Sequence, residues 1–269
     1  MNRLFTIGCS FTAYHYPTWA DIAGTAFDYF ENWGKPNSGN NYILNSLIEL
    51  DLRHKLTSED TVYIMWSGIA RQDYYVINEW LSEHNTFKQV GFSDIRGYEI
   101  LNYAWFASAQ HILDRLGVTW RMFGWQHWDA ESNIQELYAP VLAKIDSIDF
   151  KKTRTYPYSE PIDSKLLYQR LSGPDWPSHD DIIKSRYTAN KVIQTEIDKF
   201  LVARENLKQT EYTEPETHPS PASYLQFVES KLSNLTLSRE TREYITSIDE
   251  CLYENKPYEF RGSRPLVRL

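Results

Sequence analysis

Residues 61–67, TVYIMWS, place the tightest constraint on how this chain can fold. Between Thr61 and Ser67 the segment is apolar, rich in β-branched and aromatic side chains, and without polar alternation. A strand that has one face in water alternates polar and apolar residues, whereas a strand buried on both faces reads as a continuous apolar run. The segment therefore predicts a central strand of a parallel sheet that helices cover on both sides.

Strand patterns and helical patterns alternate along the rest of the chain. Leu4–Gly8 and Val118–Trp125 are predicted strands, and NWGKPNSGNN at 32–41 is predicted to be a loop. This alternation predicts an α/β fold with a central, mostly parallel sheet, in which ligands bind beyond the carboxyl ends of the strands. The predicted helices are Thr18–Phe27, Tyr42–Leu52, Gly97–Leu116, Ser223–Leu232 and Ser238–Leu252.

The 269 residues fit a single domain that carries a sizeable insertion. The sequence changes character at about 147–209, where KKTRTYPYSEP and LSGPDWPSHDD are typical of irregular loops. Within this region, residues 182–207 have a helical pattern. We predict that 147–209 is an insertion or lid on the same domain.

Charge and cysteine content exclude several classes of protein. A net charge of −8 disfavours non-specific binding to nucleic acid, because the phosphate backbone repels it. Cys9 and Cys251 lie far apart and predict neither a disulfide scaffold nor a metal site. No segment approaches the roughly 18 apolar residues of a membrane span, and the first residues lack a signal-peptide pattern. We expect a cytoplasmic protein that binds neither nucleic acid nor membrane.

Ser10 follows the first predicted strand, at the edge of the sheet where ligands bind. A serine in this place is more often a turn residue or helix cap, but a nucleophilic serine with a histidine base is the alternative. Among seven histidines, His218 has the most suggestive setting, because it precedes Pro219 in a loop that leads into a predicted helix. Glu216, two residues earlier, could accept the proton on the imidazole Nδ1.

Four segments together resemble the SGNH, or GDSL-type, serine hydrolases. They are GCSFT at 8–12, NSGNNYI at 37–43, the strand ending in MWS with an arginine beyond it, and HPSP at 218–221. The chain is most similar to compact members of bacterial and phage type, with GCSF in place of GDS. The resemblance covers roughly residues 1–125 and 210–232. It implies a three-layer α/β/α, flavodoxin-like fold, ester hydrolysis by a serine, and no need for a metal or organic cofactor.

The resemblance also implies roles for individual residues. Ser10 corresponds to the nucleophile, and its own N–H corresponds to a donor of the oxyanion hole. The Gly39 N–H corresponds to the next donor, and Asn40 either orders this loop or donates a hydrogen bond. His218 corresponds to the base.

The chain departs from the family pattern at the acidic partner of the histidine. The family places this acid three residues before the histidine, where the present chain has Pro215. Glu216 and Glu214 flank that position, and we favour Glu216.

A second departure follows the central strand. The family has Gly-x-Asn there, with the asparagine amide as an oxyanion donor, whereas this chain reads WSGIARQD at 66–73. The Ser67 hydroxyl, the Gly68 N–H or Arg71 are the possible replacements, and Arg71 would favour an anionic substrate. Losing one donor typically slows such enzymes by about 10²–10³.

Several aromatic and charged residues have two interpretations each. Trp125, His127 and Trp128 follow a predicted strand and form either a platform for a sugar ring or a packed aromatic loop. Trp66 lines the pocket or fills the core beneath it, with the core favoured, and Arg71 could simply pair with Asp73 on the surface. Two ligands, His127 and Asp129, are too few to predict a metal site.

These observations lead to one main hypothesis and two alternatives. The main one is a serine esterase that acts on a small acyl ester, such as an O-acetyl group on a carbohydrate. The first alternative is a catalytically degenerate module on the same fold that binds a glycan or a protein partner. The second keeps the nucleophile but transfers the acyl group to another hydroxyl. The sequence leaves the oligomeric state open.

Overall fold

The computed structural model describes residues 2–69, 71–76, 79–84, 95–124, 133–148 and 218–254, together with residues 256, 258 and 260. Its centre is a five-stranded parallel sheet with the strand order β2-β1-β3-β6-β7. Numbered along the chain, this is the order 2-1-3-4-5 that defines the flavodoxin-like arrangement. The strands are β1 (Arg3–Gly8), β2 (Tyr29–Gly34), β3 (Asp60–Trp66), β6 (Thr119–Gly124) and β7 (Ile145–Ser147).

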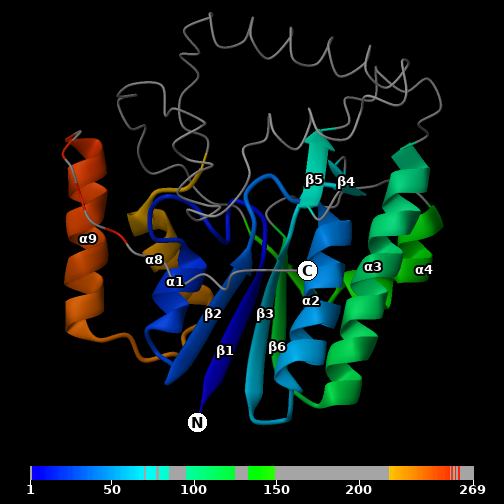
Figure 1. Cartoon of the computed structure of the whole chain (residues 1–269), viewed down its shortest axis with the longest axis horizontal. Coiled ribbons are helices and arrows are strands. Elements are labelled where there is room, and N and C mark those ends of the chain that lie inside the picture. Colours follow the sequence, from blue (N-terminus) through cyan, green and yellow to red (C-terminus); the bar gives the residue numbers. More distant parts are fainter. Residues whose placement is uncertain are drawn as a thin grey trace, which may run out of the picture. The chain divides into compact units, whose positions relative to one another are not determined.

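Helices cover both faces of this sheet (Figure 1). One face packs against α2 (Asn40–His54), α3 (Ile95–Leu116) and α4 (Asn133–Leu142). The other face packs against α1 (Trp19–Gly24), α8 (Pro221–Lys231) and α9 (Arg239–Tyr253). The predicted three-layer α/β/α fold is therefore confirmed.

The central strand β3 shows why the sheet must be covered on both sides. Val62, Ile64 and Trp66 enter the core beneath α2 and α3. Tyr63 and Met65 enter the core beneath α1 and α8. All five side chains are buried, which confirms the interpretation of the apolar run.

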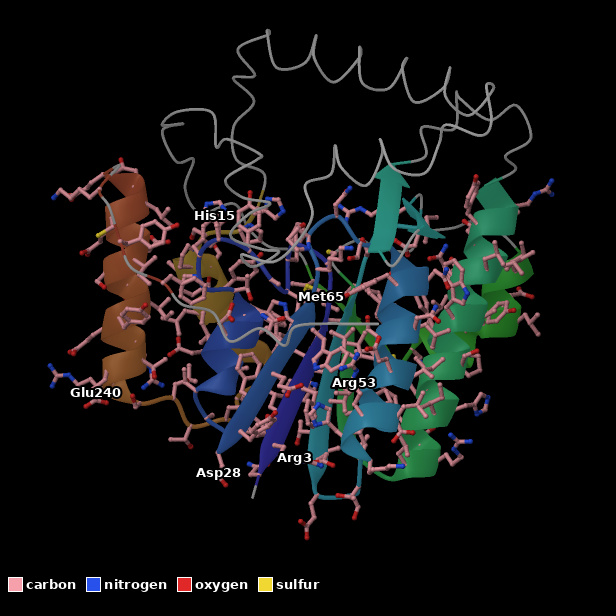
Figure 2. The ribbon with its side chains drawn as sticks, viewed as in Figure 1. Arg3, His15, Asp28, Arg53, Met65 and Glu240 are labelled. Atoms are coloured by element: carbon pink, nitrogen blue, oxygen red, sulfur yellow. The ribbon has the colours of Figure 1, made fainter. Side chains whose placement is uncertain are left out.

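An ion pair joins β1 and β3 at the amino-terminal end of the sheet, where Figure 2 shows Arg3. The Arg3 guanidinium donates from Nε and Nη2 to the two Asp60 carboxylate oxygens, at 2.6 and 2.7 Å. Burial alone would raise the pKa of Asp60, but hydrogen bonds from Arg3 and from the Thr57 N–H outweigh it and lower that pKa. The pair fixes the register of the two strands at this end.

The predicted loop at 32–41 is partly wrong, because Asn32–Gly34 belongs to β2 and Asn40 begins α2. The turn-forming composition of this segment hid an edge strand, which pairs with β1 through Asn32 opposite Thr6. The elements predicted from the sequence do not include α4, β7, or the antiparallel hairpin of β4 (Arg71–Val76) and β5 (Glu79–His84).

The predicted insertion at 147–209 lies outside the described residues, except that Ser147 ends β7 and Ile148 packs into the core. In the described part of the chain, no helix has both the length and the apolar character needed to cross a membrane.

Candidate active site

Ser10 and His218 meet at the carboxyl end of the sheet. The Ser10 Oγ lies 2.8 Å from the His218 Nε2, although the two residues are 208 positions apart. This distance is that of a hydrogen bond between a nucleophile and its base. Ser10 is 5% exposed and His218 is half-buried, so the pair is largely shielded from water.

A tight turn after β1 presents Ser10. The turn closes through hydrogen bonds from the N–H groups of Thr12 and Ala13 to the Cys9 carbonyl, at 2.9 and 3.1 Å. Gly8 permits this fold-back, because a Cβ there would lie 2.0 Å from the Thr12 Oγ1. Cys9 is fully buried, as expected for a small residue that points away from the neighbouring serine.

The loop that carries His218 is anchored at the two residues after the histidine. The Tyr16 hydroxyl donates to the Pro219 carbonyl at 3.1 Å. Ser220 caps α8 by accepting a hydrogen bond from the Ser223 N–H at 3.2 Å. Because the residues directly after the imidazole are fixed in this way, the ring is held at a defined position above Ser10.

Aromatic residues of the segment after Ser10 contact this base and its neighbour: Phe11 and Tyr14 meet the His218 ring, and Tyr16 binds the Pro219 carbonyl. The Tyr14 ring stacks on the His218 imidazole, with centroids 4.1 Å apart and an interplanar angle of 23°. The Phe11 ring contacts it at 5.2 Å and 45°. We call Phe11, Tyr14 and Tyr16 the aromatic clamp. The His15 ring packs against that of Tyr14 at a tilt of 45°, with centroids 4.2 Å apart, and Figure 2 labels His15 at this end of the sheet.

The loop before α2 is held by the first residues of β4. The Asp73 carboxylate accepts hydrogen bonds from the N–H groups of Gly39 and Tyr42, at 2.6 and 2.8 Å. Arg71 donates from Nη1 to the Ser38 carbonyl at 3.0 Å. Asp73 thus caps the amino terminus of α2 from another part of the chain.

The structure bears on two interpretations of this loop. The Gly39 N–H donates to Asp73 in this structure, and its role as an oxyanion donor stays a prediction. Arg71 and Asp73 do not form the simple surface pair considered above, because Arg71 is only 9% exposed and each residue binds the loop before α2. A side chain at Gly39 would collide with this arrangement, since a Cβ there would lie 2.8 Å from the Asp73 Oδ2.

Asn40 is a structural residue and not a side-chain donor to the oxyanion. Its Nδ2 donates to the Ser67 carbonyl at 2.9 Å and to the Asn102 Oδ1 at 2.6 Å, which uses both amide hydrogens. Its Oδ1 accepts from the Ser67 N–H at 2.7 Å. Asn40 therefore ties the start of α2 to the end of β3, as the first of its two predicted roles requires.

Trp66 is a core residue, which corrects its inclusion among the substrate-binding candidates. It is fully buried, and its ring lies 4.5 Å from that of Phe106. Ser67 is also fully buried, and its hydroxyl has no hydrogen-bond partner among the residues described. The role of this hydroxyl as an oxyanion donor stays a prediction.

Five candidates lie outside the described residues, so the structure places none of them. They are Glu214, Glu216, Trp125, His127 and Trp128. Across the ranges that the structure describes, no group of three or more His, Cys, Asp or Glu side chains could hold a metal ion.

Sequence reasoning missed the residues that hold the site together. Asn32 donates from Nδ2 to the Thr12 carbonyl at 2.7 Å and so supports the Ser10 turn. Asp73 and Asn102 hold the loop before α2 as described above. The density of aromatic residues directly after GCSF was the available signal for Tyr14.

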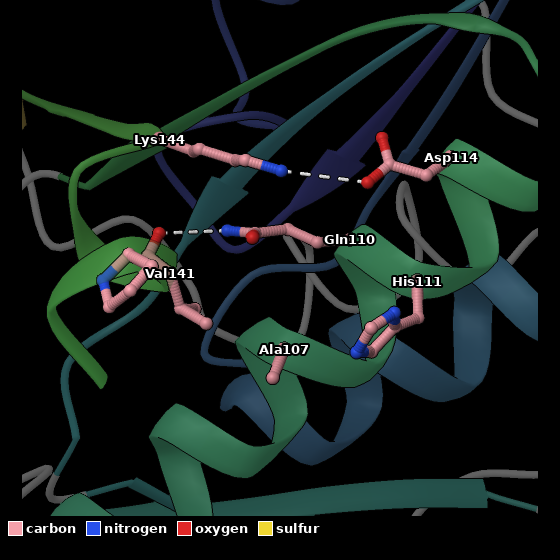
Figure 3. A pocket seen from close by; sticks show the side chains of 7 residues that line it. Ala107, Gln110, His111, Asp114, Val141 and Lys144 are labelled. Carbon is pink, nitrogen blue, oxygen red and sulfur yellow. Dashed lines mark hydrogen bonds and ion pairs between the residues drawn. The ribbon is translucent and has the colours of Figure 1, made fainter. Parts of the chain in front are cut away.

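A separate hollow of about 270 Å³ lies between α3 and α4 (Figure 3). Gln110 donates to the Val141 carbonyl at 2.8 Å across it, and Lys144 lies 3.5 Å from Asp114. None of the site residues described above lines this hollow.

The chemistry open to the Ser10–His218 pair is nucleophilic attack by a serine. An imidazole in hydrogen-bond contact with a hydroxyl can remove its proton as the oxygen bonds to an electrophilic carbon. The same imidazole, now protonated, can then protonate a leaving group. The geometry therefore suits transfer of an acyl group to Ser10.

No family model and no curated protein matches the chain. Among solved structures, it is similar to a member of the lipolytic protein G-D-S-L family from Veillonella parvula DSM 2008. The identity is 14%, the TM-score 0.33, and the match covers 55% of this chain and 77% of that chain. It is also similar to a GDSL-like lipase from Bacteroides thetaiotaomicron VPI-5482, with 16% identity, a TM-score of 0.33, and 74% and 88% coverage. The fold assignment above rests on the chain's own strand order.

Proposed function

We propose that this chain is a serine esterase of the SGNH type. The observation that carries the proposal is the 2.8 Å contact between the Ser10 Oγ and the His218 Nε2. Ser10 attacks the ester carbonyl while His218 takes its proton. The tetrahedral intermediate then expels the alcohol, which leaves with the proton from His218. Water, activated by the same imidazole, hydrolyses the acyl-enzyme and restores Ser10.

The oxyanion of this intermediate needs donors. We assign the Ser10 N–H and the Ser67 hydroxyl to this role. The Gly39 N–H joins them only when Asp73 gives up its hydrogen bond, because that carboxylate now accepts from it. As the orienting acid of His218 we propose Glu216.

We infer a small acyl group as the substrate's electrophile, for example an O-acetyl group on a carbohydrate. The aromatic segment after the third predicted strand, with Trp125, His127 and Trp128, supports a sugar as the alcohol part, because sugar rings stack on aromatic faces.

The experiment compares Ser10→Ala with the wild type on p-nitrophenyl acetate. Turnover should fall by at least about 10³-fold, since removing the nucleophile leaves only binding and oxyanion stabilisation. Ser108→Ala is the matched control, because Ser108 is an exposed serine on α3 whose hydroxyl donates to the Ala104 carbonyl of its own helix. Thermal unfolding should be alike in all three proteins. Turnover by Ser10→Ala equal to that of the wild type would rule out the mechanism.

One observation favours a second candidate, a binding module that has lost catalysis. The Asp73 carboxylate accepts a hydrogen bond from the Gly39 N–H, which the resemblance assigns as a donor to the oxyanion. A fluorophosphonate probe separates the two candidates, because it labels an activated serine covalently. Rapid labelling that Ser10→Ala abolishes supports the esterase, and no labelling of the wild type supports the binding module.

A further inference from the structure

Tyr14 makes the closest ring contact with His218 that the structure describes. The two planes are inclined by only 23°, and the centroids are 4.1 Å apart. The imidazole thus lies over the face of the phenol ring, while its Nε2 points to the Ser10 Oγ. A contact on the ring face leaves the proton-transfer edge of the imidazole unobstructed.

The charge on the imidazole changes during the proposed reaction, and the stacked ring responds to that change. The ring becomes an imidazolium when it takes the Ser10 proton. An aromatic face attracts a cation through its quadrupole, and it attracts a neutral ring less. The contact is therefore stronger in the transition state than in the ground state, which is the condition for raising the rate.

The position of Tyr14 is itself fixed by its neighbours. Tyr16, which is 1% exposed, meets the Tyr14 ring edge-on at 4.9 Å and binds the Pro219 carbonyl. His15 packs on Tyr14 at 4.2 Å and is the second titratable ring against it. The segment that presents the nucleophile therefore contacts the base at two points: Tyr14 packs on the face of the His218 ring, and Tyr16 binds the carbonyl of the next residue, Pro219.

We propose that Tyr14 is a positioning residue of the esterase site, which holds the His218 imidazole in its plane and stabilises its protonated form. This inference rests on the proposed function. The sequence resemblance assigns no role to this position.

The test compares Tyr14→Leu with Tyr14→Phe, which keeps the aromatic face. With p-nitrophenyl acetate, kcat of the leucine variant should fall about 3- to 30-fold while KM changes less than about two-fold. The phenylalanine variant should stay within about two-fold of the wild type, because the ring and not the hydroxyl makes the contact. Tyr244→Leu on α9, where Tyr244 is 46% exposed, is the matched control.

A pH profile separates stabilisation of the imidazolium from simple support of the loop. In Tyr14→Leu the acid limb of kcat/KM should move to lower pH by about half to one unit, since the protonated ring loses its partner. Tyr14→Phe should keep the wild-type limb. If the acid limb moves in His15→Gln and stays unchanged in Tyr14→Leu, the proposal is overturned.

Other outcomes would also overturn it. These are wild-type kcat and pH profile in Tyr14→Leu, or equal losses in the leucine and phenylalanine variants. If Tyr14→Leu fails to fold, Tyr14→Trp replaces it in the test. Because tryptophan makes the stronger cation–π contact, this variant should move the acid limb of kcat/KM to higher pH.

A failure of the esterase proposal can be distinguished from a failure of this inference. If the wild type neither turns over nor labels with fluorophosphonate, the proposed function fails. The ring-proton NMR signals of His218, identified by their loss in His218→Gln, then still test the contact. They should titrate at lower pH in Tyr14→Leu than in Tyr14→Phe, and identical titrations would refute the stabilisation.

Discussion

Replacing Asn40 by alanine distinguishes a structural role for this residue from a catalytic one. The side chain is fully buried and makes three hydrogen bonds, two to the Ser67 backbone and one to the Asn102 amide. At about 1 kcal/mol for each of the three bonds, and somewhat more where a partner is left buried without a bond, the loss begins at about 3 kcal/mol. We therefore expect Asn40→Ala to lower the free energy of unfolding by about 3–5 kcal/mol.

Urea unfolding followed by tryptophan fluorescence measures this loss, and kcat is measured on the same samples under conditions where the variant is folded. The melting temperature should fall by about 6–20 °C, at about 2–4 °C per kcal/mol for a chain of this size. Asn102→Ala should destabilise the protein similarly, and the double variant should lose less than the sum because the two amides bond each other.

The opposite pattern would refute the reasoning. An oxyanion donor contributes little to stability, but its removal slows the reaction by about 10²–10³. If Asn40→Ala unfolds at the wild-type urea concentration and loses about that much kcat, then the Asn40 amide acts on the substrate and its hydrogen bonds in the structure are not the functional ones.

Three further predictions concern carboxylate side chains. Asp73→Ala should lower the free energy of unfolding, measured in urea, by about 1–2 kcal/mol, because the carboxylate caps α2. Asp73→Asn should lower it less. A wild-type urea midpoint in both variants would contradict the capping role. The lowered pKa of Asp60 gives stability that is complete above its unfolded value of about 4 and is lost as pH falls through the folded value. Asp60→Asn should therefore flatten the acid side of a plot of unfolding free energy against pH, and an unaltered slope would show that the pair with Arg3 has no such effect. Glu216→Gln should lower kcat by about 10²–10⁴ if this residue orients the base, whereas Glu214→Gln should leave it within about two-fold; the reverse result would exchange their roles.

The elements that the sequence predicted are those whose signal is local. The continuous apolar run of β3 reports burial on both faces, and the long amphipathic pattern of α3 reports one covered face. The edge strand β2 was not predicted, because half of its residues are turn formers or charged and its pairing with β1 overrides that composition. The α/β architecture could therefore be predicted from the central elements, whereas the edge strands β2 and β7 could not.

The site shows the same division between local and distant information. Ser10 and His218 were found because each sits in a short recognisable segment, and the fold brings them to hydrogen-bond distance. The binding of the loop before α2 by Asp73 was not predictable, because nothing near Asp73 in the sequence marks the loop it will cap. Contacts of this kind depend on how a hairpin docks, which no single-sequence pattern reports.

The separation of the two site residues along the chain sets an order of events during biosynthesis. The serine leaves the ribosome together with the aromatic clamp, and the histidine follows 208 positions later. Contacts between such distant segments form slowly, because a long loop must close before they contribute. A nascent chain thus carries a serine without its base until α8, which follows His218, has been made and has docked beside α1.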